Sequence, residues 1–94
     1  MRVRWLRTAV RNLGEEASYI AADDPAAARL VVARVLEAIA QLADQPGLGG
    51  PGRVPNTREL VVARTRHIVP YRVKRDTVEI LRVFHTSRRW PKRG

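Results

Sequence analysis

The chain changes its hydrophobic periodicity once, at a segment that is unsuited to regular structure. Residues 46–56 read PGLGGPGRVPN and hold four of the six glycines and three of the six prolines, a composition typical of a loop or an ordered Ω-like turn. Before this segment the apolar residues recur every three or four positions, as on one face of a helix. After it they form short runs rich in β-branched residues, as in strands. The sequence therefore predicts an α+β fold in which helices precede a sheet.

Two amphipathic helices are expected before residue 46. The first carries an apolar stripe made of Leu6, Val10, Leu13, Ala17 and Ile20. The second carries a stripe with the same spacing, made of Ala28, Val32, Val35, Ile39 and Leu42. Between them, Asp24 can cap the exposed amides of the second helix, and Pro25 suits its first turn. The tight turn predicts an antiparallel hairpin whose stripes face one core.

Four segments are expected to form strands. The N-terminal segment Arg2 to Trp5 alternates and suits an edge strand, with its tryptophan packed under the sheet. Beyond the loop follow RELVVA (Arg58 to Ala63), HIVPYRV (His67 to Val73) and TVEILRVFH (Thr77 to His85). Their short polar connectors favour consecutive antiparallel hairpins. Pro70 cannot donate to a strand ladder, so its strand either lies at an edge locally or bulges there.

The length and the cysteine count narrow the class of protein. Ninety-four residues suit one domain, residues 1–94, which should bury about 60 to 65% of its unfolded-chain surface. No apolar run of about 18 residues suits a membrane span, and arginines interrupt the N-terminal apolar residues, so we expect a cytoplasmic protein without a secretory leader. The lack of cysteine excludes disulfides, thiolate metal sites and a cysteine nucleophile.

The two histidines do not predict a metal site. Neither His67 nor His85 has carboxylate neighbours at ligand spacing, so we expect no metal and no other cofactor. His67 stands in a polar connector and is expected to be solvated.

The net charge of +9 lies entirely in the second half of the chain. Six arginines face six acidic residues up to Gly52, whereas twelve lysines and arginines face three acidic residues from Arg53 onward. A field so one-sided attracts an acidic partner, either nucleic acid or protein. The alternative is a basic surface that only keeps the chain soluble.

The last expected strand carries apolar residues on both of its faces. Val78, Ile80, Arg82 and Phe84 alternate with Glu79, Leu81, Val83 and His85. One face can pack on the helices, and an open second face predicts a protein partner. In the alternative, arginine stems and Trp90 shield that face.

The order and the amino-acid sequences of these segments resemble those of a known family. GRVPNTRELVV, HIVPYRV and VEILRVFHTSRRWP, preceded by a two-helix hairpin and by LADQPGLGGPG, resemble the RelE/ParE superfamily of bacterial type II toxins, and its ParE branch in particular. The resemblance covers nearly the whole chain. It implies an N-terminal strand and an antiparallel two-helix hairpin packed on a small antiparallel sheet. It also implies a toxin that arrests growth and is neutralised by a cognate antitoxin.

Two activities are known in this superfamily. ParE-like members inhibit DNA gyrase, whereas RelE-like members cut messenger RNA on the ribosome. Cleavage of RNA needs a base, an acid and cations that stabilise the charge on phosphate. RNA-cleaving relatives tend to have an arginine early in the second sheet strand and a tyrosine after the last strand, where this chain has Ile68, Val69 and Thr86. We therefore expect a gyrase inhibitor without catalytic residues.

Two further interpretations of the function remain open. In a RelE-like nuclease that acts on the ribosome and mRNA, His85 would be the general base, with Arg82 or Arg88 as the phosphate clamp. A small DNA-binding module is disfavoured, because the basic residues lie on strands and tail and not on one helix face. The residues expected to contact the target or the antitoxin are Arg58, Arg72, Leu81, Arg82, Val83, Arg88, Arg89 and Trp90.

Overall fold

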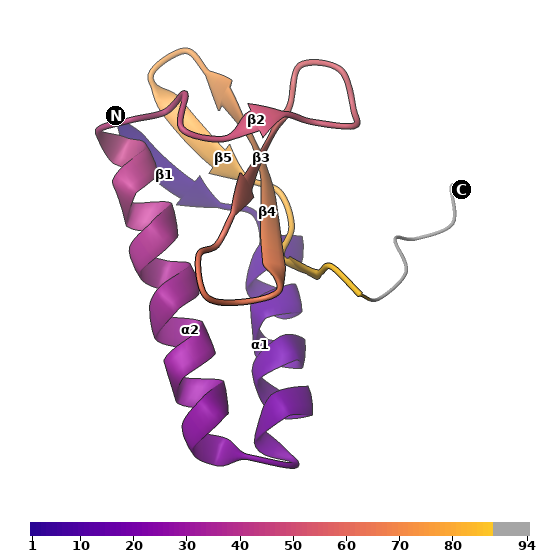
Figure 1. The fold of residues 1–94 in the computed structure, drawn as a ribbon. Coiled ribbons are helices and arrows are strands. Elements are labelled where there is room, and N and C mark those ends of the chain that lie inside the picture. The colour runs from indigo at the N-terminus through magenta and orange to yellow at the C-terminus, as the bar shows by residue number, and fades with distance from the viewer. Residues whose placement is uncertain (88–94) are drawn as a thin grey trace.

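The protein folds as a two-helix hairpin packed on a mixed sheet. The structure, a computed structural model, describes residues 1–87. Its elements, in chain order (Figure 1), are β1 (Arg2–Trp5), α1 (Arg7–Ala21), α2 (Pro25–Ala40), the 3₁₀ turn η1 (Gln41–Ala43), β2 (Gly50–Pro51), β3 (Arg58–Val61), β4 (His67–Lys74), β5 (Thr77–Ile80) and β6 (Phe84–His85). The predicted α+β class is confirmed.

The sheet has the order β1-β5-β4-β3-β2, and β6 pairs with β4 beyond the end of β5. The expected consecutive hairpins are present, since β3, β4 and β5 pair antiparallel. The N-terminal strand lies at an edge, as expected, but it runs parallel to β5, so the sheet is mixed. Inside the glycine-rich segment, Gly50 and Pro51 form a two-residue strand against β3. This part of the segment is therefore more regular than its composition indicates.

The two helices run side by side as a hairpin (Figure 1). Asp24 caps α2, because its Oδ1 accepts a hydrogen bond from the Ala27 amide at 3.1 Å, and Pro25 occupies the first turn. Both expectations are confirmed. The predicted stripe of the second helix is also buried at Ala28, Val35 and, past the end of α2, Leu42.

The predicted stripe of the first helix is partly wrong. Val10 is 56% exposed, whereas Ala9 is fully buried. The buried line of α1 runs through Ala9, Leu13 and Glu16, which are spaced by four and three residues. It includes a carboxylate that pairs with a buried histidine of the sheet. Hydropathy alone assigns a carboxylate to the solvent side of a helix. The sequence pattern therefore predicts a buried face of α1 that is turned by about one residue from the observed one.

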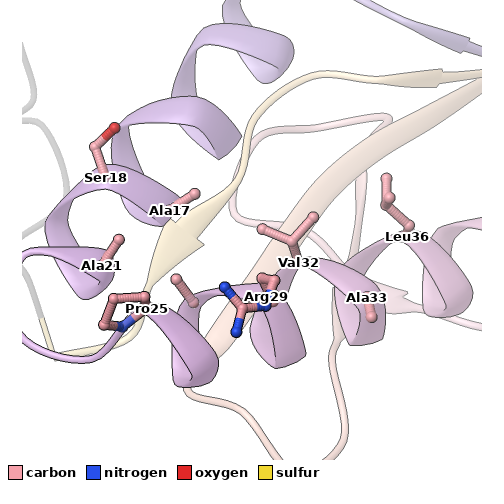
Figure 2. A pocket seen from close by; sticks show the side chains of 9 residues that line it. Ala17, Ser18, Ala21, Pro25, Arg29, Val32, Ala33 and Leu36 are labelled. Atoms are coloured by element: carbon pink, nitrogen blue, oxygen red, sulfur yellow. The ribbon is translucent and has the colours of Figure 1, made fainter.

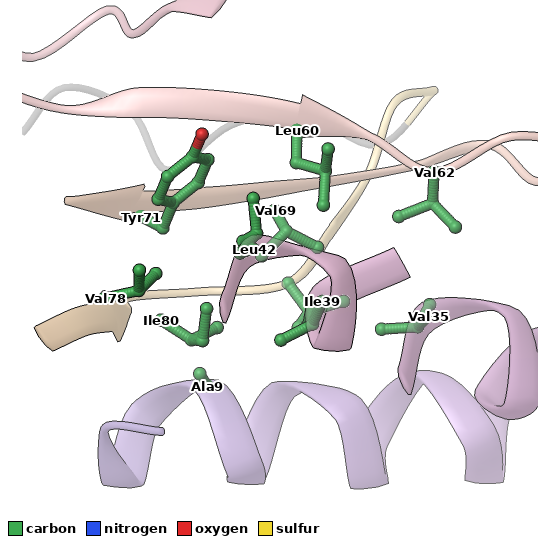
Figure 3. Packing of buried hydrophobic residues seen from close by; sticks show 11 residues of the cluster. Ala9, Val35, Ile39, Leu42, Leu60, Val62, Val69, Tyr71, Val78 and Ile80 are labelled. Atoms are coloured by element: carbon green, nitrogen blue, oxygen red, sulfur yellow. The ribbon is translucent and has the colours of Figure 1, made fainter. Parts of the chain in front are cut away.

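The core lies between the helices and one face of the sheet. Figure 3 shows Ala9 of α1 on one side of this core and the strand residues Val69 and Tyr71 on the other. The fully buried cluster comprises Ala9, Val35, Ile39, Leu42, Leu60, Val62, Val69, Tyr71, Val78, Ile80 and Val83. Trp5 packs against this cluster, as expected.

Tyr71 connects this core to the glycine-rich segment. Its hydroxyl donates to the Pro46 carbonyl and accepts from the Gly49 amide, both at 2.8 Å. A Cβ at Gly49 would lie 2.7 Å from the Glu59 carbonyl oxygen and from Cε1 of Tyr71. Only glycine fits there without a shift of the backbone, so the segment is ordered against the sheet.

The expected continuous strand from Thr77 to His85 is wrong. Tyr71 faces Ile80 and Ile68 faces Phe84, so β4 has two residues where its partner has three. This mismatch is a β-bulge. Leu81 donates its amide to the Pro70 carbonyl at 2.9 Å. The proline, which has no amide hydrogen, lies opposite the bulge, so the extra residue is on the partner segment and not on the strand of Pro70 as expected.

Candidate interaction surfaces

One apolar surface lies on the helical hairpin. Figure 2 shows a groove between α1 and α2, and the groove holds about 520 Å³. Its lining consists of Ala17, Ser18, Ala21, Pro25, Ala28, Arg29, Val32, Ala33 and Leu36. Most of these side chains are small, so another backbone can approach the hairpin closely. Leu36 is 46% exposed at one end of the groove. The sequence analysis missed this groove, although alanines at i and i+4 in α1 were a visible signal.

The outer face of the sheet carries a second surface, which is cationic. Strand alternation places the neighbours Arg4, Glu79 and Arg72 in one row across β1, β5 and β4 on the face away from the core. The next row on this face holds Arg2, Thr77 and Lys74.

Glu79 organises the first of these rows. The residue is 7% exposed, and its Oε1 accepts a hydrogen bond from Nε of Arg72 at 2.6 Å. Nη1 of Arg4 lies 3.6 Å from the other carboxylate oxygen. The hydrogen bond from Arg72 is the largest influence on the pKa of Glu79 and lowers it. Burial opposes this effect, and the charges of Arg72, Lys74 and Arg4 lower the pKa further. The carboxylate therefore stays ionised and holds both guanidinium groups.

The depressed pKa of Glu79 predicts a pH-dependent contribution to stability. A carboxyl whose pKa is lower in the folded state stabilises the fold above its unfolded pKa and loses that contribution as pH falls through the folded pKa. We expect Glu79→Gln to melt below wild type at neutral pH, with a difference that shrinks once pH drops below the ordinary value of 4.5. Thermal melts from neutral to acidic pH measure this difference. A constant difference across the whole range would contradict the prediction.

The apolar part of the outer face is mostly shielded. By register, Val61, Ile68 and Phe84 lie on this face, of which Val61 is 72% exposed and Ile68 only 7%. The guanidinium carbon of Arg82 lies 5.9 Å from the centroid of the Phe84 ring, within range of a cation–π contact. Arg82 thus covers part of this face, as in the alternative of shielding by arginine stems and Trp90, although Trp90 lies outside the described residues. Val61 remains a well-exposed apolar side chain there.

The prediction that His67 is solvated is wrong. His67 begins β4, is 3% exposed, and its Nε2 lies 3.0 Å from Oε1 of Glu16 on α1. Its Nδ1 is buried and has no hydrogen-bond partner among the residues that the structure describes. A proton on Nε2 avoids an unpaired buried donor, so the geometry favours this tautomer with Nε2 donating to Glu16. The pair connects α1 to the sheet.

His85 lies beside this pair at the end of the sheet. Its ring meets the ring of His67 edge-on, with centroids 5.1 Å apart. Its Nδ1 accepts from the Ser87 amide at 3.2 Å and lies 2.8 Å from the Ser87 hydroxyl oxygen. These contacts fit a strand-end histidine that orders the residues after it. His85 and Phe84 lie on alternate faces of β6, and the Arg82 guanidinium lies over the Phe84 ring. Arg88, the other clamp expected of a nuclease, lies outside the described residues.

The other predicted contact residues are scattered. Nη1 of Arg58 donates to the Gly49 carbonyl at 2.7 Å and supports the loop, while Arg72 is held by Glu79. Leu81 is partly buried at the bulge. Val83 is 2% exposed and belongs to the core, because the bulge turns it inward, so its assignment to a contact surface is wrong. Arg88, Arg89 and Trp90 lie outside the described residues.

Residues 1–87 contain neither a candidate metal site nor a candidate membrane span. No group of three or more histidine, aspartate or glutamate residues there is arranged to hold a metal ion. Within the same range, neither long helix has the length and apolar character that crossing a bilayer requires.

The comparisons with known proteins agree with this architecture. Residues 3–90 match the family described as the ParE toxin of the type II toxin-antitoxin system, parDE. The chain therefore belongs to the ParE toxin family.

Individual relatives are similar over nearly their whole length. The chain is 51% identical over 90 residues to "Putative toxin Y4kP" of Sinorhizobium fredii (strain NBRC 101917 / NGR234), covering 96% of this chain and 93% of that protein. Among solved structures, the chromosomal ParDE TA system from P. aeruginosa matches with a TM-score of 0.82 and 29% identity, covering 93% of this chain and 97% of that one. The toxin-antitoxin complex RelBE2 from Mycobacterium tuberculosis matches with a TM-score of 0.63 and 29% identity, covering 89% and 95%.

Proposed function

We propose that this ParE-family toxin inhibits DNA gyrase in the cytoplasm, arrests growth, and is neutralised by a cognate antitoxin. The observation that carries the choice of gyrase is the arrangement at the end of the sheet. His85 is engaged by Ser87 and packs on His67, and the Arg82 guanidinium lies over the Phe84 ring. Tyr71, the tyrosine of the basic half, is fully buried with both hydrogen bonds used inside the fold. Within residues 1–87 these contacts support structural roles for His85 and Tyr71, which favours a gyrase inhibitor over a nuclease.

A RelE-like ribonuclease is the second candidate, since the RelBE2 complex has a similar fold. Replacing His85 tests it. If His85 is structural, His85→Gln keeps toxicity within a few-fold of wild type, whereas loss of a general base costs about 10²- to 10⁴-fold in rate. Growth arrest on induction is the measurement, with a melting curve of the purified variant as control. Complete loss of toxicity with an unchanged melting curve, and cut messenger RNA in the wild type, would support the nuclease.

The groove on the helical hairpin is the proposed docking site of the antitoxin. An amphipathic helix can place its apolar face into such a groove. The small lining residues permit close approach, and Arg29 in the lining suits an acidic residue beside that apolar face. Both solved relatives are described as toxin-antitoxin assemblies, which supports a protein partner for a chain of this fold.

Two leucines of α2 provide a matched test of this docking site. Leu36 lines the groove and is 46% exposed, whereas Leu30 is 49% exposed and does not line it. We expect Leu36→Glu to weaken antitoxin binding at least about 10-fold, because it places an unpaired charge in an apolar interface, while Leu30→Glu binds like wild type. Isothermal titration of each purified variant with antitoxin measures the affinity. Equal affinities of the two variants would place the antitoxin elsewhere.

A further inference from the structure

The groove proposed for the antitoxin does not include the cationic end of the outer sheet face. Arg2 and Arg4 lie on β1, and Arg72 and Lys74 lie on β4, with β5 between these strands. Strand register places all four side chains on the face away from the core. Arg75, in the turn after β4, lies next to this group.

This region is hollowed and carries a net positive charge. A cavity of about 680 Å³ is lined by Arg2, Val3, Arg4, Lys74, Arg75, Asp76, Thr77 and Glu79. With Arg72, which pairs with Glu79, the region holds five cationic and two acidic side chains, a difference of +3. Glu79 is already used by Arg72 and Arg4. Asp76 accepts a hydrogen bond from the Thr77 hydroxyl at 3.3 Å.

The lining indicates the chemical class of the ligand. Protein interfaces are built around an apolar and aromatic centre, whereas Val3, the apolar residue in this lining, packs against the core. Contacts to phosphate need cations and hydroxyl groups without apolar anchors. Arg2 and Arg4, two residues apart on a strand, are separated by about 7 Å. Cations at this spacing can contact phosphates of one nucleic acid strand.

Glu79 makes this site more than a set of flexible surface cations. One carboxylate oxygen accepts a hydrogen bond from Arg72 at 2.6 Å, and the other lies 3.6 Å from Nη1 of Arg4. Arg72 therefore loses less side-chain freedom when an anion binds. Arg4 lies on β1 and Arg72 on β4, and the strand register fixes the positions of both strands beside β5. The cations therefore present a defined row to a ligand.

We propose that this surface binds the phosphodiester backbone of a nucleic acid. Gyrase acts on DNA and the ribosome contains RNA, so the inference does not depend on which of the two the toxin blocks. The shared chemistry is phosphate, and separate DNA and RNA arms distinguish the source.

The test uses the purified toxin and fluorescence anisotropy with a 20-base-pair DNA duplex and an RNA duplex of the same sequence. The double variant R2E/K74E reverses two charges at the site, and R7E/R11E reverses two exposed charges on α1, with the same change in net charge. We expect R2E/K74E to weaken binding at least about 10-fold and to lower the slope of log K against log salt by about 2, since each phosphate contact contributes about 0.9. R7E/R11E should stay within a few-fold of wild type.

Several outcomes overturn the proposal. Equal weakening in both double variants would mean that net charge alone attracts the duplex. Wild-type protein that binds neither duplex, or R2E/K74E that loses affinity for the antitoxin but not for nucleic acid, would also reject it. If R2E/K74E fails to fold, Lys74→Gln removes one exposed charge, and an unchanged salt slope in that variant rejects the site. The assay contains no gyrase or ribosome, so its failure would not bear on the proposed toxin activity.

Discussion

Glu16→Ala is expected to lower the free energy of unfolding by about 1 to 3 kcal/mol, because it removes the acceptor of the buried His67 ring nitrogen and leaves a polar group unsatisfied. For a chain of this size each kcal/mol corresponds to about 4 to 8 °C in melting temperature. Urea denaturation at neutral pH measures the loss.

The conservative variant Glu16→Gln is the control for this stability prediction. It keeps an acceptor oxygen of nearly the same reach, so it should recover most of the stability. If Glu16→Ala unfolds at the same urea concentration as wild type, the contact between α1 and β4 does not contribute to the fold as we infer.

The second large effect is expected in the basic tail. Reversing Arg88 and Arg89 to glutamate should abolish gyrase inhibition if these residues contact the target, and a melting curve of the variant is the control for folding. Supercoiling assays over a range of toxin concentrations measure the inhibition. R7E/R11E is again the matched control, since it changes the net charge equally at another surface.

A truncated chain separates the tail from the rest of the molecule. If the protein ending at Ser87 still folds, binds antitoxin and inhibits gyrase at normal concentration, the tail has no role at the target. The contact surface would then have to include Arg58, Arg72 or Arg82 on the body of the protein.

Periodicity and turn residues predicted the elements of this fold well. The helix start at Asp24 and Pro25 and the hairpins of β3, β4 and β5 follow from local rules about caps, donors and short polar connectors. Such rules act over a few residues, so one sequence is enough to apply them. Because its missing amide hydrogen is a local property, Pro70 even indicated the position of the bulge, although not the strand that carries it.

The errors concern contacts between residues far apart in the chain. Glu16 and His67 are 51 residues apart, and each is assigned to solvent when its own neighbourhood is considered alone. Burial becomes favourable only when the two meet, since a buried polar group needs a partner. The same argument explains the rotation of α1, which places Ala9 in the core and Val10 outside.

The candidate surfaces were less predictable than the elements. Sequence alternation suggested that Val83 faces a partner, but the bulge between Ile80 and Phe84 shifts the alternation by one residue and buries Val83. The hairpin prediction placed α1 beside α2 but did not show which side chains line the groove between them. The cationic rows around Glu79 combine β1 with β4 and β5, which the sequence did not place together. Both surfaces could be recognised only from the packed structure.

The most direct test of the central claim measures gyrase supercoiling and in vitro translation with the same purified protein, with and without its antitoxin. The account predicts that the toxin inhibits supercoiling, that translation proceeds with intact messenger RNA, and that added antitoxin restores supercoiling. Normal supercoiling together with blocked translation and cleaved messenger RNA would contradict the account.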